Sequence, residues 1–224
     1  MNNRLKFRYV FGSEEYPEYV GQDYNDVFGF YEIKFKNKDI VKFNFGVSQR
    51  AKEDNVCGDS YLVYDSDSKK IFALSDGMGT GRGAKEKSKL ALHLFKKFMD
   101  VGFDEVHALN SINCILKNEY VKDSYATLDL FVYDKNNGDF YFYKNGAGNS
   151  YLLKEREVEN IDGNDLPLGI VDKIDVKAQK VEINSGDTVI LVSDGVGEEK
   201  LRLLNNLKNK NSQSFAREIL NSSN

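Results

Sequence analysis

The chain has 224 residues, 41% of them apolar and 12% aromatic, and carries a formal net charge of −4. This length and composition allow a sizeable core and argue against wholesale disorder. The negative balance disfavours nucleic acids as partners, and no apolar run approaches the ~20 residues of a membrane span or forms a signal peptide. Two cysteines, Cys57 and Cys114, fit a reducing, cytoplasmic setting without structural zinc.

Strand signals dominate the chain. Runs of β-branched and aromatic residues predict strands at 4–11, 27–35, 40–47, 61–64, 71–74, 126–133, 140–143 and 188–192. Turn-forming residues at 65–68 and 136–138 separate two pairs of these runs, and Asn-Gly is a strong hairpin signal because both residues tolerate positive φ. We therefore expect antiparallel hairpins at both places.

Helical periodicity appears between the groups of strands. Apolar residues recur at helical spacing over 84–99 and again over 104–119, where Asp104 can cap the helix. We expect the two helices to pack as an antiparallel pair that mostly buries the following apolar side chains: Leu94, Phe95, Phe98, Val106, Leu109 and Ile112. Two further helices are predicted at 198–207 and 212–220. Because the helices do not alternate one for one with strands, the pattern predicts an α+β fold with antiparallel sheets.

The most informative motif is a strand ending that occurs twice. Ile-Phe-Ala-Leu runs into Ser-Asp-Gly at Asp76, and Val-Ile-Leu-Val runs into Ser-Asp-Gly at Asp194. Each copy places a carboxylate where an apolar strand emerges, and the glycine lets the backbone turn sharply. Two such carboxylates form an oxygen-only site suited to Mg²⁺ or Mn²⁺, which can activate a water for attack on a phosphoester. The simpler alternative is that Ser-Asp-Gly is merely a turn.

Several other polar residues bear on the hypothesis of a metal site. Asp59 precedes the strand at 61–64 and can lie near Asp76 if that strand pairs with 71–74. Asp129 interrupts a strand, so it faces either solvent or a site, and solvent is the safer assumption. The glycine-rich run at 77–83 matches neither a P-loop nor a dinucleotide fingerprint. We interpret His93, His107 and Cys57 as structural.

Together these motifs resemble a known family. GVSQRAKEDNVCGDSY, ALSDGMGTG, ATLDL, YKNGAGNSYLL, LPLGI and VILVSDGV occur in the order seen in the phosphatase domain of stage II sporulation protein E. That domain belongs to the PPM superfamily, the type 2C metal-dependent serine/threonine phosphatases, and the resemblance covers about residues 41–221. It implies an αββα sandwich of two antiparallel sheets flanked by helices.

The resemblance also implies chemistry. Asp76 would bridge two metals, Mn²⁺ or Mg²⁺, with the Gly77 carbonyl and Asp59 on one side and Asp194 on the other. A water activated by the metals would hydrolyse phosphoserine or phosphothreonine on a protein, typically an anti-sigma-factor antagonist. Arg50 could contact the phosphate, although a surface role is equally compatible. The two central helices match a regulatory switch region of this branch. Homodimerisation is left open.

Both ends depart from the family pattern. The family continues into a strand carrying Asp-Asp-Met-Thr, and the first acid of this motif is a ligand of the second metal. The chain stops just short of it, so we expect a missing C-terminal strand, a weakened second metal site and poor activity. Residues 8–30 instead resemble a short signature of the choice-of-anchor L type β-domain. We therefore expect a β-rich extension over 1–40 and the phosphatase domain over 41–224.

Three functions follow from these features. The first is a metal-dependent protein phosphatase, supported by three acids at family positions. The second is a catalytically impaired module of the same fold that binds a phosphoprotein or regulator, supported by the missing ligand. The third is an extracellular adhesion-type β-domain, supported only by residues 8–30. Hydrolysis of p-nitrophenyl phosphate that depends on Mn²⁺ separates the first from the others.

Overall fold

A computed structural model describes residues 18–27, 30–36, 41–51, 56–117, 125–155, 157–163, 166–193 and 212–221. The chain divides into two compact units, Met1–Phe43 and Asn44–Asn224. The expected strand at 4–11 and the expected helix at 198–207 lie outside the described residues. No helix in the described ranges is long and apolar enough to cross a membrane.

The first unit contains one antiparallel hairpin, made of β1 (Glu18–Asn25) and β2 (Phe30–Lys36). Tyr24 faces Tyr31 across the two strands, and their ring centroids lie 4.8 Å apart. The sequence predicted β2 but missed β1, whose run contains a glycine, Gly21. In the structure the register shifts between Tyr19 and Gly21, so Val20 is the extra residue and Gly21 pairs with Lys34.

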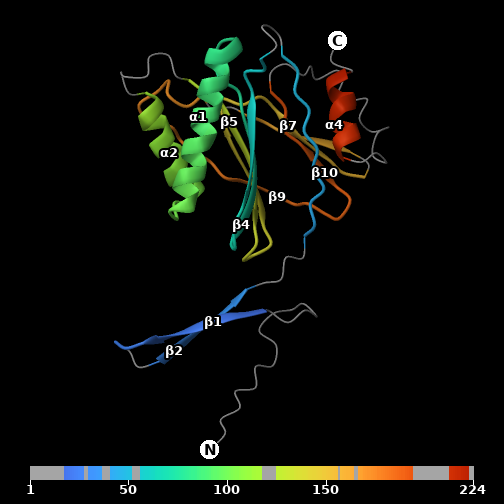
Figure 1. The fold of residues 1–224 in the computed structure, drawn as a ribbon. Helices are drawn as coiled ribbons and strands as arrows, with labels where there is room; N and C mark the ends of the chain where they lie inside the picture. Colours follow the sequence, from blue (N-terminus) through green and yellow to red (C-terminus); the bar gives the residue numbers. More distant parts are fainter. Residues whose placement is uncertain are drawn as a thin grey trace, which may run out of the picture. The chain divides into compact units, whose positions relative to one another are not determined.

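The second unit contains two antiparallel sheets (Figure 1). The larger sheet has the order β3–β4–β5–β6–β9, with bounds Ser60–Asp65, Lys69–Ser75, Leu128–Asp134, Phe140–Asn145 and Gln179–Val181. The smaller sheet has the order β10–β7–β8, with bounds Thr188–Ile190, Ser150–Leu153 and Val158–Ile161. Both expected hairpins, β3–β4 and β5–β6, are present. Gly138 adopts φ 78° in the β5–β6 turn, as the Asn-Gly signal predicts.

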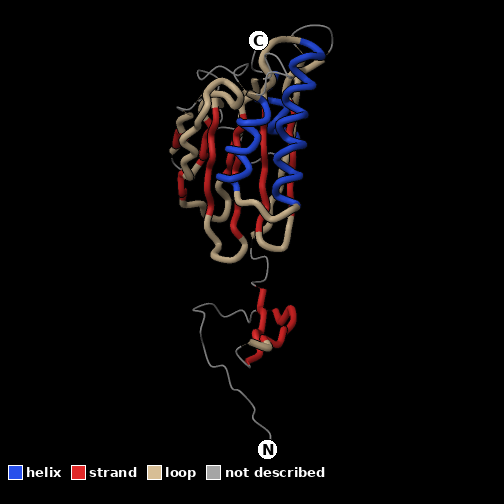
Figure 2. The backbone as a smooth tube through the Cα atoms, turned by 90° about the vertical axis from the view of Figure 1, so that its left-hand side faces the viewer, coloured by secondary structure: helices blue, strands red, loops and turns tan. Residues whose placement is uncertain are grey.

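Helices cover the outer faces of the two sheets (Figures 1 and 2). Helices α1 (Gly81–Asp100) and α2 (Glu105–Leu116) lie on the larger sheet, where Phe95 and Leu109 are completely buried against strand residues such as Ile71. Helix α4 (Ser212–Asn221) lies on the smaller sheet, where its Phe215 and Ile219 join a core cluster with residues of β7 and β10. This is the predicted αββα sandwich.

The α1–α2 pair agrees with the sequence pattern at all but one of the positions expected to be buried. Phe95, Leu109 and Ile112 are fully buried, and Leu94 and Phe98 are partly buried. Val106, by contrast, is 38% exposed, so that expectation was wrong. The buried stripe of α2 starts instead at Glu105, whose carboxylate pairs with Lys69 of β4 at 2.7 Å, and this leaves the next position facing outward.

The expected strand at 40–47 was also wrong. Residues 41–50 form no strand, and the Val47 backbone instead exchanges two hydrogen bonds with the side chain of Gln213 in α4. A Cβ on Gly46 would come within 2.2 Å of the Ser212 carbonyl oxygen, so this approach requires glycine. Strands β7, β8 and β9, of three or four residues each, were not predicted.

The N-cap of α2 gives a test of this helical layer. Asp104 Oδ1 accepts a hydrogen bond from the His107 backbone N–H at 2.8 Å, and this bond holds the pKa of Asp104 below its usual value. We expect Asp104→Ala to lower the free energy of unfolding by about 1 kcal/mol at neutral pH in urea denaturation. Because a carboxyl with a lowered pKa stabilises only when ionised, the loss should shrink as pH falls through that pKa.

Asp104→Asn is the matched control, since the amide oxygen can still accept the bond and should retain most of the stability. Equal stability of the Ala variant and the wild type at neutral pH would show that the cap does not stabilise α2.

Candidate functional site

The pairing of β3 with β4 brings two of the predicted acids together. The ladder pairs Ser60 with Ser75, so Asp59 and Asp76 lie immediately beyond it at the same edge of the sheet. A Cβ built on Gly58 would lie 4.0 Å from Asp76 Oδ1 and 3.8 Å from the Gly77 carbonyl oxygen. The Asp76 carboxylate and the Gly77 carbonyl therefore both lie beside the backbone that carries Asp59.

The second Ser-Asp-Gly motif approaches the same end of the β3–β4 ladder. Ser193 follows β10 and donates a hydrogen bond from its hydroxyl to Asp59 Oδ2 at 2.8 Å. Asp194 is the next residue in the chain, but it lies outside the described residues. The described residues thus bring Asp59, Asp76, Gly77 and Ser193 to one edge, and the placement of Asp194 stays a prediction.

The backbone at Asp76 is held on both sides by Thr127, just before β5. The Asp76 N–H donates to Thr127 Oγ1 at 2.9 Å, and the Thr127 N–H donates to the Asp76 carbonyl at 2.9 Å. The following glycine is required by packing, because a Cβ on Gly77 would lie 1.8 Å from the Ala84 carbonyl oxygen of α1. The motif therefore serves as a tight junction between β4 and the first turn of α1.

Sequence reasoning missed two residues that connect α1 to the site. Ser88 donates to the Gly58 carbonyl at 2.6 Å, and Lys85 donates from Nζ to the Asp59 carbonyl. Gln49 also donates to the Asp59 carbonyl, at 3.0 Å. The spacing of Lys85 and Ser88, three residues apart on a helix that follows the glycine-rich run, is the signal that could have indicated them.

The remaining predicted residues are less closely tied to the acids. Arg50 is exposed in the segment beside Gln49, and its contact with phosphate stays a prediction. Cys57 is partly buried two residues before Asp59, and burial raises the pKa of its thiol. His93 is exposed on α1, and His107 contacts the Asp104 carboxylate at the far end of the helical pair.

Asp129 corrects the sequence-based assumption that it faces solvent. Its side chain is 1% exposed and pairs through Oδ2 with Lys144 Nζ at 2.7 Å, and the Ser150 hydroxyl contacts both groups. Burial raises the pKa of Asp129 and lowers that of Lys144, because each charge has left water. This pair links β5, β6 and β7 between the sheets, and the structure gives it a structural role.

The donor set at the sheet edge fits a hard divalent cation. It consists of two carboxylates and one carbonyl, and all three are oxygen ligands of the kind that Mg²⁺ and Mn²⁺ prefer. Within the described ranges no group of three or more His, Cys, Asp or Glu side chains forms a metal cluster. The further acid that the second motif supplies, Asp194, follows directly on Ser193 and lies outside those ranges.

Comparison with known proteins identifies the family to which the chain is related. The sequence profile of the family "Stage II sporulation protein E (SpoIIE)" matches residues 66–222. Stage II sporulation protein E of Bacillus subtilis (strain 168) is 31% identical over 172 residues, or 76% of this chain and 21% of that protein. The chain thus spans about a fifth of the length of this relative.

Solved structures agree with the sequence comparison. A structure of the PP2C phosphatase domain and a fragment of the regulatory domain of SpoIIE from Bacillus subtilis has a TM-score of 0.70 and 29% identity, covering 80% of this chain and 56% of that one. RsbX in complex with magnesium shares the fold, with a TM-score of 0.60, 23% identity and coverage of 78% and 82%. The fold is that of a PP2C-type phosphatase domain. The chain belongs to the stage II sporulation protein E family.

The buried Asp129–Lys144 pair gives a prediction on stability. Lys144→Met leaves the Asp129 carboxylate buried without its cation, so we expect a loss of about 3–5 kcal/mol in the free energy of unfolding at pH 8. Burial already raises the pKa of Asp129, and removing Lys144 raises it further. The folded variant then binds a proton that the unfolded chain does not, so its deficit should narrow as pH falls.

The double variant Asp129→Leu/Lys144→Met is the control, because it removes both charges and should recover most of the lost stability. Urea denaturation at several pH values measures the free energy of unfolding of the wild type, of Lys144→Met and of the double variant. A pH-independent deficit in Lys144→Met would contradict the assignment of an ionised, buried pair.

Proposed function

We propose that the chain is a metal-dependent protein serine/threonine phosphatase. The observation that carries this proposal is the meeting of Asp59, Asp76 and the Gly77 carbonyl at one sheet edge, where Ser193 delivers the second Ser-Asp-Gly motif. Membership in the family and the PP2C-type fold support it, and RsbX, of the same fold, was solved with magnesium.

Each residue has a proposed role. Asp59, Asp76, Asp194 and the Gly77 carbonyl would hold one or two Mg²⁺ or Mn²⁺ ions, which when bound supply an activated water and offset the charge of the phosphoryl group. Thr127 orients the Asp76 backbone through two hydrogen bonds, one to its side-chain hydroxyl and one from its own N–H. Ser193 orients Asp59 by donating to its carboxylate. Arg50 would contact the phosphoryl oxygens as a bidentate donor.

The proposed substrate is phosphoserine or phosphothreonine on another protein, by family analogy an anti-sigma-factor antagonist. Because the proposed site holds half-buried carboxylates and a backbone carbonyl, we propose that affinity for the substrate comes from protein surface around the phosphorylated residue. A cytoplasmic location, compatible with the two free thiols, belongs to the same proposal.

We expect Asp76→Asn to lower Mn²⁺-dependent release of phosphate from p-nitrophenyl phosphate by about 100-fold or more, because it removes negative charge from a carboxylate that would hold the metal. Calorimetric titration with Mn²⁺ should show weakened binding in the same variant. Asp67→Asn is the control, since Asp67 is exposed in the turn at the other end of the β3–β4 hairpin.

Wild-type turnover and wild-type Mn²⁺ affinity in Asp76→Asn would overturn the proposed site. A wild-type chain that binds phosphoserine peptides and releases no phosphate would instead be the catalytically impaired binding module.

A further inference from the structure

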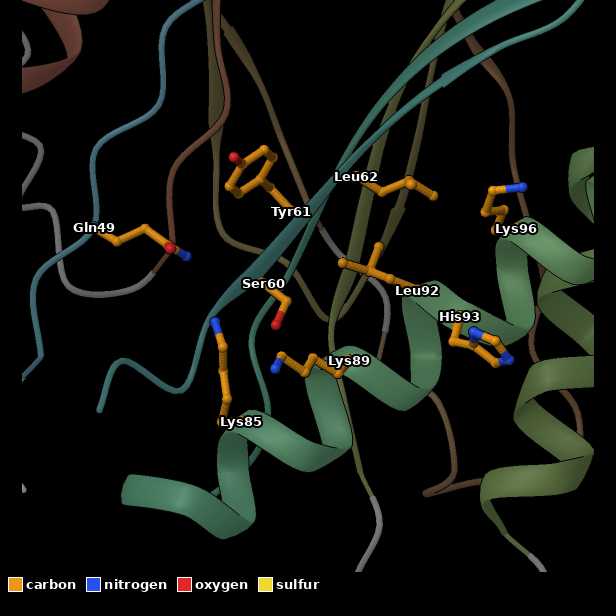
Figure 3. A pocket seen from close by; sticks show the side chains of 9 residues that line it. All are labelled: Gln49, Ser60, Tyr61, Leu62, Lys85, Lys89, Leu92, His93 and Lys96. Atoms are coloured by element: carbon orange, nitrogen blue, oxygen red, sulfur yellow. The ribbon is translucent and has the colours of Figure 1, made fainter. Parts of the chain in front are cut away.

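A cationic pocket adjoins the proposed site along α1 and β3 (Figure 3). Its volume is about 450 Å³, and its lining consists of Gln49, Ser60, Tyr61, Leu62, Lys85, Lys89, Leu92, His93 and Lys96. None of these nine residues is acidic, although the chain as a whole carries a net charge of −4. The pocket therefore concentrates positive charge on a protein of the opposite net sign.

One end of the pocket lies at the proposed metal ligands. Lys85 and Gln49, both lining residues, donate hydrogen bonds to the backbone carbonyl of Asp59. In Figure 3, Lys85 and Lys89 extend from α1 toward β3, and Lys96 lies farther along the same helix, at the opposite end of the pocket. A ligand lying in the pocket would thus begin beside Asp59 and continue along α1.

The lysines differ in how far their charges are already compensated. Lys85 bonds a neutral carbonyl, and Lys89 is exposed with no hydrogen-bond or ion-pair partner among the described residues. Lys96 pairs with Asp100 at 2.7 Å, but this is a half-exposed i,i+4 pair of the kind that contributes little and exchanges easily. A ligand with several carboxylates would complement all three.

The length and lining of the pocket indicate an extended peptide. Lys85 and Lys96 are eleven residues apart on α1, or about 16 Å at about 1.5 Å per residue. An extended chain covers that distance with about five residues at about 3.3 Å each. Leu62 of β3 adds a partly buried apolar side chain to the lining, and the half-exposed Tyr61 lies at its rim.

We infer that this pocket binds an acidic segment of the phosphoprotein substrate, next to the residue whose phosphoryl group enters the proposed site. The inference rests on the proposed function for its choice of partner. Recognition would depend on Asp and Glu side chains within about five residues of the phosphorylated serine or threonine. Lys89 and Lys96 would form ion pairs with these acidic side chains.

The test compares binding of two fluorescent peptides by anisotropy. One is a phosphoserine flanked on both sides by Asp and Glu, and the other has Asn and Gln at those positions. We expect the wild type to bind the acidic peptide about tenfold more tightly, and Lys89→Glu/Lys96→Glu to lose that advantage. Raising NaCl from about 50 to about 300 mM should reduce the advantage as well.

Lys97→Glu is the matched control, because Lys97 is exposed on the same helix and does not line the pocket. It should bind the acidic peptide within about twofold of wild type. Where the double Glu variant does not fold by circular dichroism, Lys89→Gln/Lys96→Gln replaces it. Equal affinity of the wild type for both peptides, or an unchanged affinity in the double variant, would overturn the inference.

Turnover of p-nitrophenyl phosphate separates this inference from the proposed function. That small substrate has no acidic flanks, so Lys89→Glu/Lys96→Glu should hydrolyse it at the wild-type rate. A wild type with no turnover would refute the phosphatase assignment, while the peptide comparison would still decide whether the pocket binds acidic segments.

Discussion

The register of β3 against β4 is the constraint on which the proposed site depends. Pairing Ser60 with Ser75 leaves Asp59 and Asp76 as neighbours just past the end of the ladder. A slip of one residue would turn the buried side chains of β4, such as Ile71 and Ala73, away from the helices. The core that fixes the register therefore also fixes the positions of the two carboxylates. The same packing thus stabilises the sheet and holds the proposed metal site together.

Helix α1 holds the backbone of the proposed site from its outer side. Its first turn packs so closely on the site that Gly77 admits no side chain, and Lys85 and Ser88 bond the carbonyls of Asp59 and Gly58. Any shift of α1 along the sheet would break these bonds and move the backbone that carries Asp59. The cationic pocket lies along the same helix, and its lining residue Lys85 is one of the two α1 side chains that hold this backbone.

Sequence patterns predicted what local chemistry determines. The β3–β4 hairpin and the Asp104 cap each depend on residues close together in the chain. Other features depend on distant partners and could not be predicted this way. Asp129 is buried because Lys144 of the neighbouring strand and Ser150 of the other sheet meet it. Val47 lies in no strand and bonds the side chain of Gln213 in α4 instead.

The most direct test of the proposed metal centre is a crystal structure of the chain grown with Mn²⁺, with the ion located by its anomalous scattering. We predict density at the edge where β3 begins and β4 ends, with carboxylate oxygens of Asp59 and Asp76 at about 2.0–2.6 Å from the ion. Mn²⁺ found elsewhere, or an edge without density at saturating Mn²⁺, would contradict the proposed centre.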